Sequence, residues 1–314
     1  MRIGIDIMGG DLGPLEAIKG CAQAVKELPG TEVVLIGNKE TAKPLFDEAG
    51  VNADIFHFVH ADEVIGMADS PVKAISQKRN SSIAIGFGLL KEGQIDAFAS
   101  AGNTGAMMVG AMYSVKTIEG VIRPAIGTIL PKITGGLGYM LDMGANADCK
   151  PDVLFQFGVL GSLYAKYVYG IDNPRVSLLN IGEEKEKGNL NTQAAYQLME
   201  GTPLFNFIGN AEGRDLFLDK SDVVVCDGFT GNAILKACES MCYLLMKRGV
   251  KDDFLNMFNP ELYGGTAVLG VNAPVIIGHG NSSATSFLNM IKLGLNVAES
   301  KLPEKIRNSF SLSS

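Results

Sequence analysis

The sequence predicts an α/β fold, a three-layer α/β/α sandwich around a mainly parallel sheet. Short apolar runs alternate with longer amphipathic runs along the 314 residues, in the order that strands and helices follow in such a fold. The runs at 223–226 and 274–277 are apolar without alternation, which suits strands that are covered on both faces. We treat 1–314 as a single domain, which could form two lobes flanking a cleft.

The expected elements follow this alternation in chain order. Strands are predicted at 2–7, 32–37, 54–59, 95–99, 126–129, 139–142, 175–181, 205–209, 223–226 and 273–278. Helices are predicted at 14–27, 39–48, 71–91 with a break near Asn80, 104–116, 151–168, 190–200, 230–247 and 282–299. The serine-rich end, Ser309 to Ser314, is predicted to be a frayed tail.

The composition excludes several classes of protein. The net charge of −7 argues against nucleic acid as a partner, because phosphate contacts need clustered Lys and Arg. The five cysteines contain no CxxC pair, so we expect free buried thiols in a reducing cytosol and no metal site. No apolar run approaches the roughly 20 residues that span a bilayer. We therefore expect a cytoplasmic protein that at most touches a membrane surface.

A recurring junction is the most informative feature of the chain. A buried strand ends, a short turn rich in Gly, Asn, Ser or Asp follows, and a helix begins. Carboxyl ends of parallel strands lie at one edge of a sheet, where helix N-termini offer free N–H groups that suit phosphate. Any one such turn can be a mere connection, but five with polar tips favour an anion site. They lie at 7–11, 98–106, 141–151, 225–232 and 277–283.

None of these turns is a familiar nucleotide or hydrolase motif. The sequence has no GxxxxGK[ST], no GxGxxG after a strand with an acidic residue about 20 positions on, and no GxSxG. The charged loop 180–189 also follows a predicted strand. It could be a solvated turn, or a lid whose Lys-Gly-Asn end holds an anion, and its spacing favours neither interpretation.

Seven ordered motifs resemble a known family. They are Ile5–Asp11 (IDIMGGD), Ser100–Ala106 (SAGNTGA), Leu141–Asn146 (LDMGAN), Leu178–Glu184 (LLNIGEE), Phe207–Asp215 (FIGNAEGRD), Asp227–Asn232 (DGFTGN) and Tyr263–Gly265 (YGG). The series resembles the phosphate acyltransferase of bacterial phospholipid synthesis, the PlsX family. The likeness runs in order from near residue 1 to about residue 298.

The resemblance implies an acyltransferase that converts acyl-carrier protein and inorganic phosphate to acyl phosphate and free carrier protein. It also implies a homodimer without cofactor or metal, and a fold similar to phosphotransacetylase and the isocitrate and isopropylmalate dehydrogenase group. By motif, Lys187 and Asn232 look like the catalytic positions. His279 could orient or protonate a group, or be a buried structural histidine. The residues assigned to binding phosphate or the acyl carrier are Asn103, Thr104, Gly105, Asn146, Asp227, Gly231 and His279.

The chemistry is compatible with these residue types. Phosphate is itself a nucleophile, so the enzyme needs no nucleophile of its own. The thioester carbonyl becomes an oxyanion as phosphate attacks, and an ammonium such as Lys187 or an amide such as Asn232 can stabilise it. Asn103, Thr104 and Gly105 are expected to cradle phosphate because they open a helix. Asp142 is expected to shape its loop or cap a helix.

One segment departs from the family. Only 30 residues, 233–262, separate Asn232 from Tyr263, where the resemblance implies a longer projecting pair of helices. This shortened helical segment could contact a dimer partner, or lie on the inner face of the membrane as an amphipathic helix. Its basic residues could also form the positive patch that an acidic carrier protein needs. They are Lys247, Arg248 and Lys251.

Three rival functions remain open from the sequence. A phosphotransacetylase or phosphotransbutyrylase would use the same chemistry on coenzyme A thioesters. A noncatalytic scaffold for carrier protein or membrane would leave the polar turns unexplained. A metal-dependent dehydrogenase of related fold would need a cofactor loop that the sequence does not contain.

Overall fold

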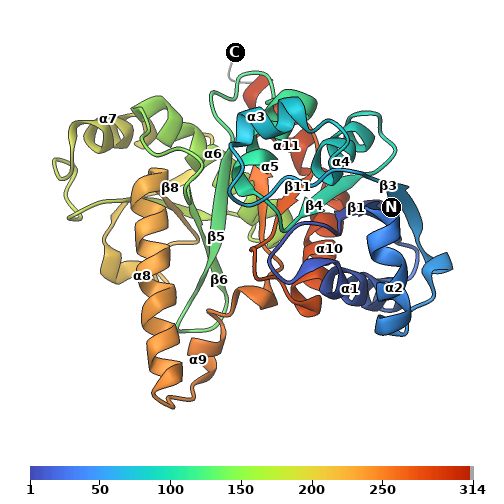
Figure 1. Cartoon of the computed structure of the whole chain (residues 1–314). Helices are drawn as coiled ribbons and strands as arrows, with labels where there is room; N and C mark the ends of the chain where they lie inside the picture. The colour runs from blue at the N-terminus through green and yellow to red at the C-terminus, as the bar shows by residue number, and fades with distance from the viewer. Residues whose placement is uncertain (312–314) are drawn as a thin grey trace. The chain divides into compact units, whose positions relative to one another are not determined.

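Two units make up the part of the chain that the structure, a computed structural model, describes, residues 1–311 (Figure 1). Unit 1 consists of Met1–Thr117 and Pro260–Pro303. Unit 2 consists of Ile118–Asn259 and the C-terminal stretch that begins at Glu304. Within the described residues, no helix is both long and apolar enough to cross a membrane.

Unit 1 contains six strands, of which only the last in the sheet runs against its neighbour. Their spatial order is β3 (His57–His60), β2 (Glu32–Gly37), β1 (Arg2–Asp6), β4 (Ala97–Ser100), β11 (Val275–Ile277) and β10 (Thr266–Leu269). Since β1 to β4 and β11 are parallel, their carboxyl ends lie at one edge. This edge carries the turns after β1, β4 and β11.

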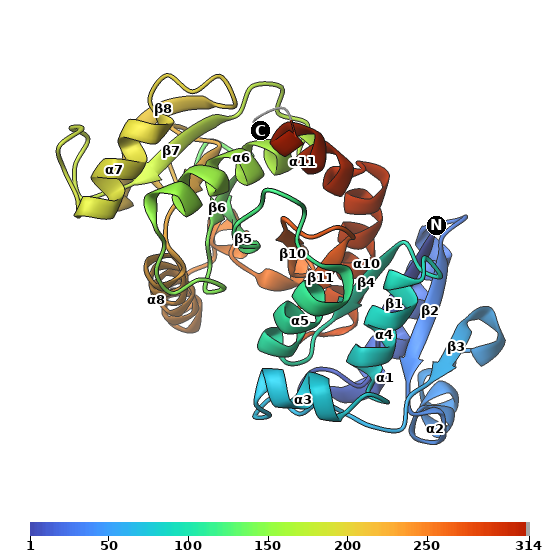
Figure 2. The same ribbon diagram turned by 90° about the horizontal axis from the view of Figure 1, so that it is seen from above.

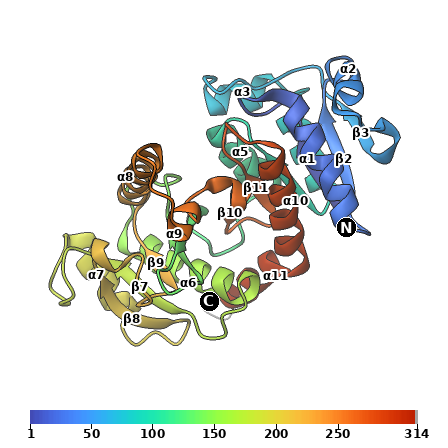
Figure 3. The ribbon, with the colours of Figure 1, turned by 90° about the horizontal axis from the view of Figure 1, so that it is seen from below.

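Helices cover both faces of the unit 1 sheet. Successive residues of a strand point to opposite faces, and β4 shows this directly. Ala97 lies near Gly294 of α10, whereas Phe98 lies near Gly86 of α4. Helices α1 and α10 pack side by side (Figure 3). The helices of this unit are α1 (Gly13–Glu27), α2 (Lys39–Ala49), α3 (Pro71–Gln77), α4 (Ser82–Lys91), α5 (Thr104–Gly110) and α10 (Ala284–Glu299), with short turns of helix η1 (Ala53–Ile55), η2 (Ala111–Val115) and η4 (Pro260–Leu262).

Unit 2 contains a hairpin that continues into parallel strands. The strand order is β5 (Ala125–Pro131), β6 (Leu137–Leu141), β9 (Val223–Val225), β7 (Arg175–Leu179) and β8 (Asn206–Ala211), with β5 antiparallel to β6. Helix α6 packs on β6, β7 and β9 and against α7 (Figure 2). The helices are α6 (Pro151–Val168), α7 (Leu190–Met199), α8 (Gly228–Lys247) and α9 (Asp253–Asn256), with η3 (Gly213–Asp215). The last helix of the described residues is α11 (Leu302–Ser311).

The structure confirms the predicted α/β class, the mainly parallel sheet and the helix break near Asn80. One strand and two α-helices of the described residues were not predicted, β10, α9 and α11, and neither were the short helical turns η1, η3 and η4. Strand β10, Thr-Ala-Val-Leu between glycines, lacks the unbroken run of Val and Ile that marks β9 and β11. The frayed tail is wrong for Ser309 to Ser311, which are helical; residues 312–314 lie outside the described part. The serine-rich composition drew attention away from the helical spacing of Leu302, Ile306 and Phe310. The first two of these side chains are buried.

Candidate active site

Three of the predicted turns meet at the carboxyl edge of unit 1. A side chain on Gly9 would lie 2.6 Å from the Gly102 nitrogen, so the first two turns can touch only through glycine. The Asp11 N–H donates to the Gly280 carbonyl at 2.6 Å, which joins the first turn to the one after β11. Buried Asp6 accepts from Ser100 Oγ at 2.6 Å beneath them. Burial raises the pKa of Asp6 above its usual range, although these hydrogen bonds oppose the shift.

Asn103 is a structural residue of this edge. Its Oδ1 accepts from the Ala106 N–H at 2.9 Å and so caps α5. Its Nδ2 donates to the carbonyls of Gly66, Met67 and Asp69 at 3.0–3.1 Å. The side chain is therefore committed to the fold. An anion could still bind to the backbone N–H groups of Thr104 and Gly105, because the first N–H groups of a helix have no partner within the helix.

His279 is exposed, so the alternative of a buried structural histidine is wrong. Its backbone carbonyl accepts from the N–H and Oγ of Ser282 at 3.1 and 2.6 Å, which shapes the turn before α10. The imidazole lies at the surface of the edge that carries Thr104 and Gly105.

Two further turns meet at the carboxyl edge of unit 2. The Asp142 N–H donates to the Cys226 carbonyl at 2.9 Å, and the Gly228 N–H donates to the Asn146 carbonyl at 2.7 Å. Asn146 is buried, and its Nδ2 donates to Pro124 O and Asp142 Oδ2. Asp142 also accepts three backbone N–H groups, and burial raises its pKa. Asn146 and Asp142 thus hold the loop in shape.

The edges of the two units carry matching motifs. In unit 1 a buried aspartate ends β1 and the turn Gly102-Asn103-Thr104-Gly105 follows β4, its neighbour in the sheet. In unit 2 a buried aspartate follows β6 and the turn Gly228-Phe229-Thr230-Gly231 follows β9, again its neighbour. The shared pattern, Gly-x-Thr-Gly, is too short to reveal a duplication in the sequence.

The beginning of α8 is built for close approach to the Asp142 loop. Asp227 caps the helix, with Oδ1 accepting from the Thr230 N–H at 2.8 Å and Oδ2 from Thr230 Oγ1 at 2.9 Å. A side chain on Gly231 would overlap the Asp142 carbonyl. Asn232 is exposed beside Gly144. Asp227 and Gly231 therefore place Asn232 next to the loop.

The loop between β7 and α7 presents Lys187 to solvent. Amide side chains hold its backbone: Asn180 donates to the Lys187 carbonyl at 3.1 Å, and Asn210 donates to the Glu184 carbonyl at 2.9 Å. Gly188, with φ of 92°, leaves room for Asn180 and Thr192, which a side chain would strike. Among residues 1–311, no carboxylate lies within ion-pair distance of Lys187 Nζ. Its ammonium is thus available to a ligand.

A cavity of about 450 Å³ lies between this loop and the start of α8. Gly188 and Asn189 line it directly after Lys187, and Asp227, Thr230 and Ile234 line it on either side of Asn232. Sequence analysis included Asn189 in the Lys-Gly-Asn end of the loop but missed Thr192, whose N–H donates to the capping Asn189 Oδ1 at the start of α7. The full lining is Leu154, Leu178, Leu179, Asn180, Ile181, Gly188, Asn189, Thr192, Gly213, Cys226, Asp227, Thr230 and Ile234.

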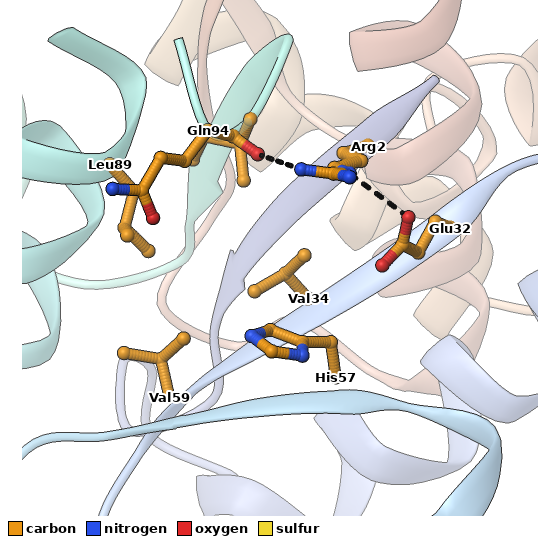
Figure 4. Close-up of a pocket in the computed structure, with 8 residues that line it drawn as sticks. Arg2, Glu32, Val34, His57, Val59, Leu89 and Gln94 are labelled. Atoms are coloured by element: carbon orange, nitrogen blue, oxygen red, sulfur yellow. Dashed lines mark hydrogen bonds and ion pairs between the residues drawn. The ribbon is translucent and has the colours of Figure 1, made fainter. Parts of the chain in front are cut away.

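A second, smaller cavity of about 160 Å³ lies at the opposite edge of the unit 1 sheet, where β1, β2 and β3 begin (Figure 4). Arg2 lies over it and is already bonded to Glu32 at 3.0 Å and to the Gln94 carbonyl at 3.4 Å. This cavity is remote from the polar turns of its unit. Within residues 1–311, no group of three or more His, Cys, Asp and Glu side chains could hold a metal ion.

Comparisons with known proteins identify relatives along nearly the whole chain. Residues 1–305 match the family model described as fatty acid synthesis protein. The phosphate acyltransferase of Dictyoglomus turgidum is 39% identical over 325 positions, covering 98% of this chain and 96% of the relative. That of Desulforamulus reducens is 43% identical over 329 positions, covering 98% and 97%. Both alignments are longer than the chain, so the relatives have residues that it lacks.

Solved structures confirm the expected likeness to phosphotransacetylases. A phosphotransacetylase from Streptococcus pyogenes superposes with a TM-score of 0.69 at 17% identity, covering 95% of this chain and 94% of that one. A branched-chain phosphotransacylase from Enterococcus faecalis superposes with a TM-score of 0.63 at 14% identity, covering 95% and 99%. At such low identity the likeness concerns the fold alone. The family model and the sequence relatives establish the family: the chain belongs to the phosphate acyltransferase (PlsX) family and is an acyltransferase.

Proposed function

We propose that this chain transfers a fatty-acyl group from the thioester of acyl-carrier protein to inorganic phosphate. The products are acyl phosphate and free carrier protein, and the acyl phosphate feeds phospholipid synthesis. Membership of the phosphate acyltransferase family supports the reaction. The observation that carries the proposal for this chain is the cavity lined by Gly188 and Asn189, directly after Lys187, and by Asp227 and Thr230 at the start of α8, while Asn232 does not line it and lies beside Gly144.

The proposed reaction is a direct displacement. A phosphate oxygen attacks the thioester carbonyl carbon and forms the new C–O bond, which makes the carbonyl oxygen an oxyanion. The C–S bond then breaks, and the departing thiolate takes up the proton that the phosphate group releases. Lys187 and Asn232 are proposed to donate to the oxyanion and to offset the charge of the approaching phosphate. Asp227 and Gly231 fix the helix start from which Asn232 projects.

Phosphate binding is proposed for the backbone N–H groups of Thr104 and Gly105. Asn103 supports them through its cap and its three bonds to the loop at 66–69. Asn146 has the corresponding supporting role in unit 2. His279 remains a candidate for orienting phosphate, and its exposure is compatible with this role.

The decisive experiment mixes the protein with palmitoyl-carrier protein, with and without phosphate, and measures free thiol and acyl phosphate. We expect both products to form in equal amounts and only with phosphate. A parallel reaction with palmitoyl-coenzyme A tests the phosphotransacetylase alternative, which predicts the faster rate there. Absence of phosphate-dependent thioester loss with either carrier would leave only a noncatalytic role.

A basic cluster is proposed as the docking point for the acidic carrier protein. Lys247, the last residue of α8, and Arg248 and Lys251 just after it are all exposed. In a protein of net charge −7, such a local patch is needed to attract an acidic partner. Replacing all three by Glu should raise KM for acyl-carrier protein and leave KM for phosphate unchanged. An unchanged KM for the carrier at low salt would exclude this patch.

A homodimer contact is proposed for α8. Only Gly228, Gly231 and Cys242 of its 20 residues are buried, and Figure 1 shows it extending along unit 2 with α9 after its far end. Phe254 and Phe258 of the α9 region pack on Phe217. The side chains left uncovered on α8 are Phe229, Met241, Tyr243, Leu244 and Met246.

Sedimentation equilibrium should therefore give twice the chain mass of 33.3 kDa, and Leu244→Glu should halve it. If the mass is that of one chain, liposome flotation at low salt tests the membrane alternative.

A cytoplasmic location is proposed from the five free cysteines, four of them buried, which suit a reducing compartment.

A further inference from the structure

We propose that the cavity in unit 2 holds the part of the acyl chain next to the thioester, and so sets the chain-length preference. This inference rests on the proposed function, because it names the portion of that substrate which the site takes. Three features of the cavity support the inference. Its floor is apolar, the polar side chains of its rim already have hydrogen-bond partners within the protein, and it lies beside the loop that carries Lys187.

The floor of the cavity is apolar and buried. Leu154 of α6 and Leu178 and Leu179 of β7 form it, together with Cys226 after β9. Burial raises the pKa of the Cys226 thiol well above its usual value, so this side chain is neutral. The floor thus offers no charge and no strong hydrogen-bonding group, and it suits a hydrocarbon better than a polar ligand.

The polar side chains of the rim already bond to one another. Asp227 accepts both the N–H and the hydroxyl of Thr230, and Asn189 accepts the N–H of Thr192 at 3.0 Å. Asn180 bonds at both ends, accepting from the Ile181 N–H and donating to the Lys187 carbonyl. These groups therefore shape the mouth without needing a polar ligand. The pantetheine arm carries amides that would find no partner on the floor, which makes it the poorer occupant.

The position and size of the cavity fit an acyl chain. Gly188 and Asn189, directly after Lys187, line it, so a chain lying inside brings its thioester carbonyl to the mouth near that lysine. A volume of about 450 Å³ lies within the usual range of ligand pockets.

The test compares kcat/KM for butyryl-, octanoyl- and palmitoyl-carrier protein. In the wild-type protein each methylene that enters the cavity should raise kcat/KM by about fourfold until the cavity is full. Ile234→Trp places a bulky ring in the cavity from the half-buried side of α8. If it displaces two or three methylenes, the palmitoyl-to-butyryl ratio should fall by about 30-fold while butyryl turnover persists.

A second variant, Ile181→Glu, tests the same inference in case Ile234→Trp does not fold. Ile181 lines the mouth but is 80% exposed, so Ile181→Glu should fold normally and still lower the same ratio. Leu198, 49% exposed on α7 outside the cavity, supplies matched controls as Leu198→Trp and Leu198→Glu, which should leave the ratio unchanged.

The outcomes separate this inference from the proposed function. A wild-type protein that turns over no thioester would sink the proposed function itself. Normal wild-type turnover, combined with an unchanged ratio in either folded cavity variant, would overturn only the assignment of the acyl chain to this cavity.

Discussion

Lys187 is the single residue on which the proposed chemistry depends most. Its carbonyl and its neighbours are tied into the loop, while its ammonium has no carboxylate partner among the residues described. A cation that is held at its backbone and free at its tip is suited to meet a developing oxyanion. Lys185, two positions earlier, is instead paired with Glu200 and lies over Tyr196.

The two lysines make a matched test. Lys187→Ala should lower kcat by at least about 100-fold, the scale of losing one oxyanion donor. Lys185→Ala should leave kcat within about threefold, because it removes only an exposed ion pair with Glu200 and a contact with the Tyr196 ring. Steady-state rates with palmitoyl-carrier protein and saturating phosphate, alongside thermal melting curves, give the measurement. Near-normal kcat in folded Lys187→Ala would remove this residue from the chemistry.

The asparagines show how far the sequence can predict a site. Asn103, Asn146 and Asn232 all stand at or near polar turns, and from sequence all three are candidates for binding substrate. In the structure two of them are committed to capping and to loop carbonyls, and Asn232 alone is exposed. An Asn that caps a helix and one that contacts a ligand occupy the same kind of turn. Only the partners of the side chain distinguish them, and those come from distant parts of the chain.

At the scale of elements, the strand-end turns could be predicted because local chemistry dictates them. The helix of 151–168 and the strand of 32–37 have the predicted bounds, since Pro151 and the flanking turns fix their ends. What the sequence could not predict is which turns touch. The contact of Gly228 with Asn146 joins residues more than 80 positions apart, and no local pattern encodes it.

Gly231 is the glycine whose loss should matter most to α8. Gly231→Ala should destabilise the fold by about 1–3 kcal/mol and lower activity, because the new methyl group overlaps the Asp142 carbonyl and moves Asn232. Gly88→Ala is the control: it lies within α4 with open space around it, so it should stabilise by about 0.5–1 kcal/mol. Urea unfolding of both variants measures the difference. Equal stability of the two would show that α8 tolerates a side chain at its close approach.

For the whole molecule, the sequence predicted the class of fold and missed its internal correspondence. Each unit pairs a buried aspartate with a Gly-x-Thr-Gly turn on the next strand, yet the residues around these motifs differ. The matching features are dictated by backbone geometry, which few residue types satisfy. The rest of each unit needs only well-packed apolar side chains, which many sequences provide. Outside these motifs, the two units therefore show no matching sequence.

Global stability should depend on an ion network at the other end of the unit 2 strands. Lys132 and Asp222 are both buried and lie 2.6 Å apart, and Arg175 donates to Asp222 at 2.9 Å. Burial alone would raise the pKa of Asp222, but the bonds from Arg175 and Lys132 outweigh it and hold the pKa far below 3.8. A carboxyl whose pKa is lowered by folding stabilises the native state above its unfolded pKa. That contribution is lost as the pH falls below about 3.8 toward the folded value.

Asp222→Asn tests this dependence directly. At pH 7 this substitution should lower the free energy of unfolding by about 3 kcal/mol. Lys132 stays buried but loses the carboxylate of Asp222 and keeps only that of Asp219. The gap between wild type and variant should narrow steadily from pH 4 to pH 2, since the wild-type carboxyl becomes protonated there. Asp172→Asn, at an exposed aspartate near Arg175, should change stability by less than about 0.5 kcal/mol at any pH. Urea titrations across this range would contradict the network if the Asp222→Asn gap stayed constant, because a constant gap means that the carboxyl does not titrate with folding.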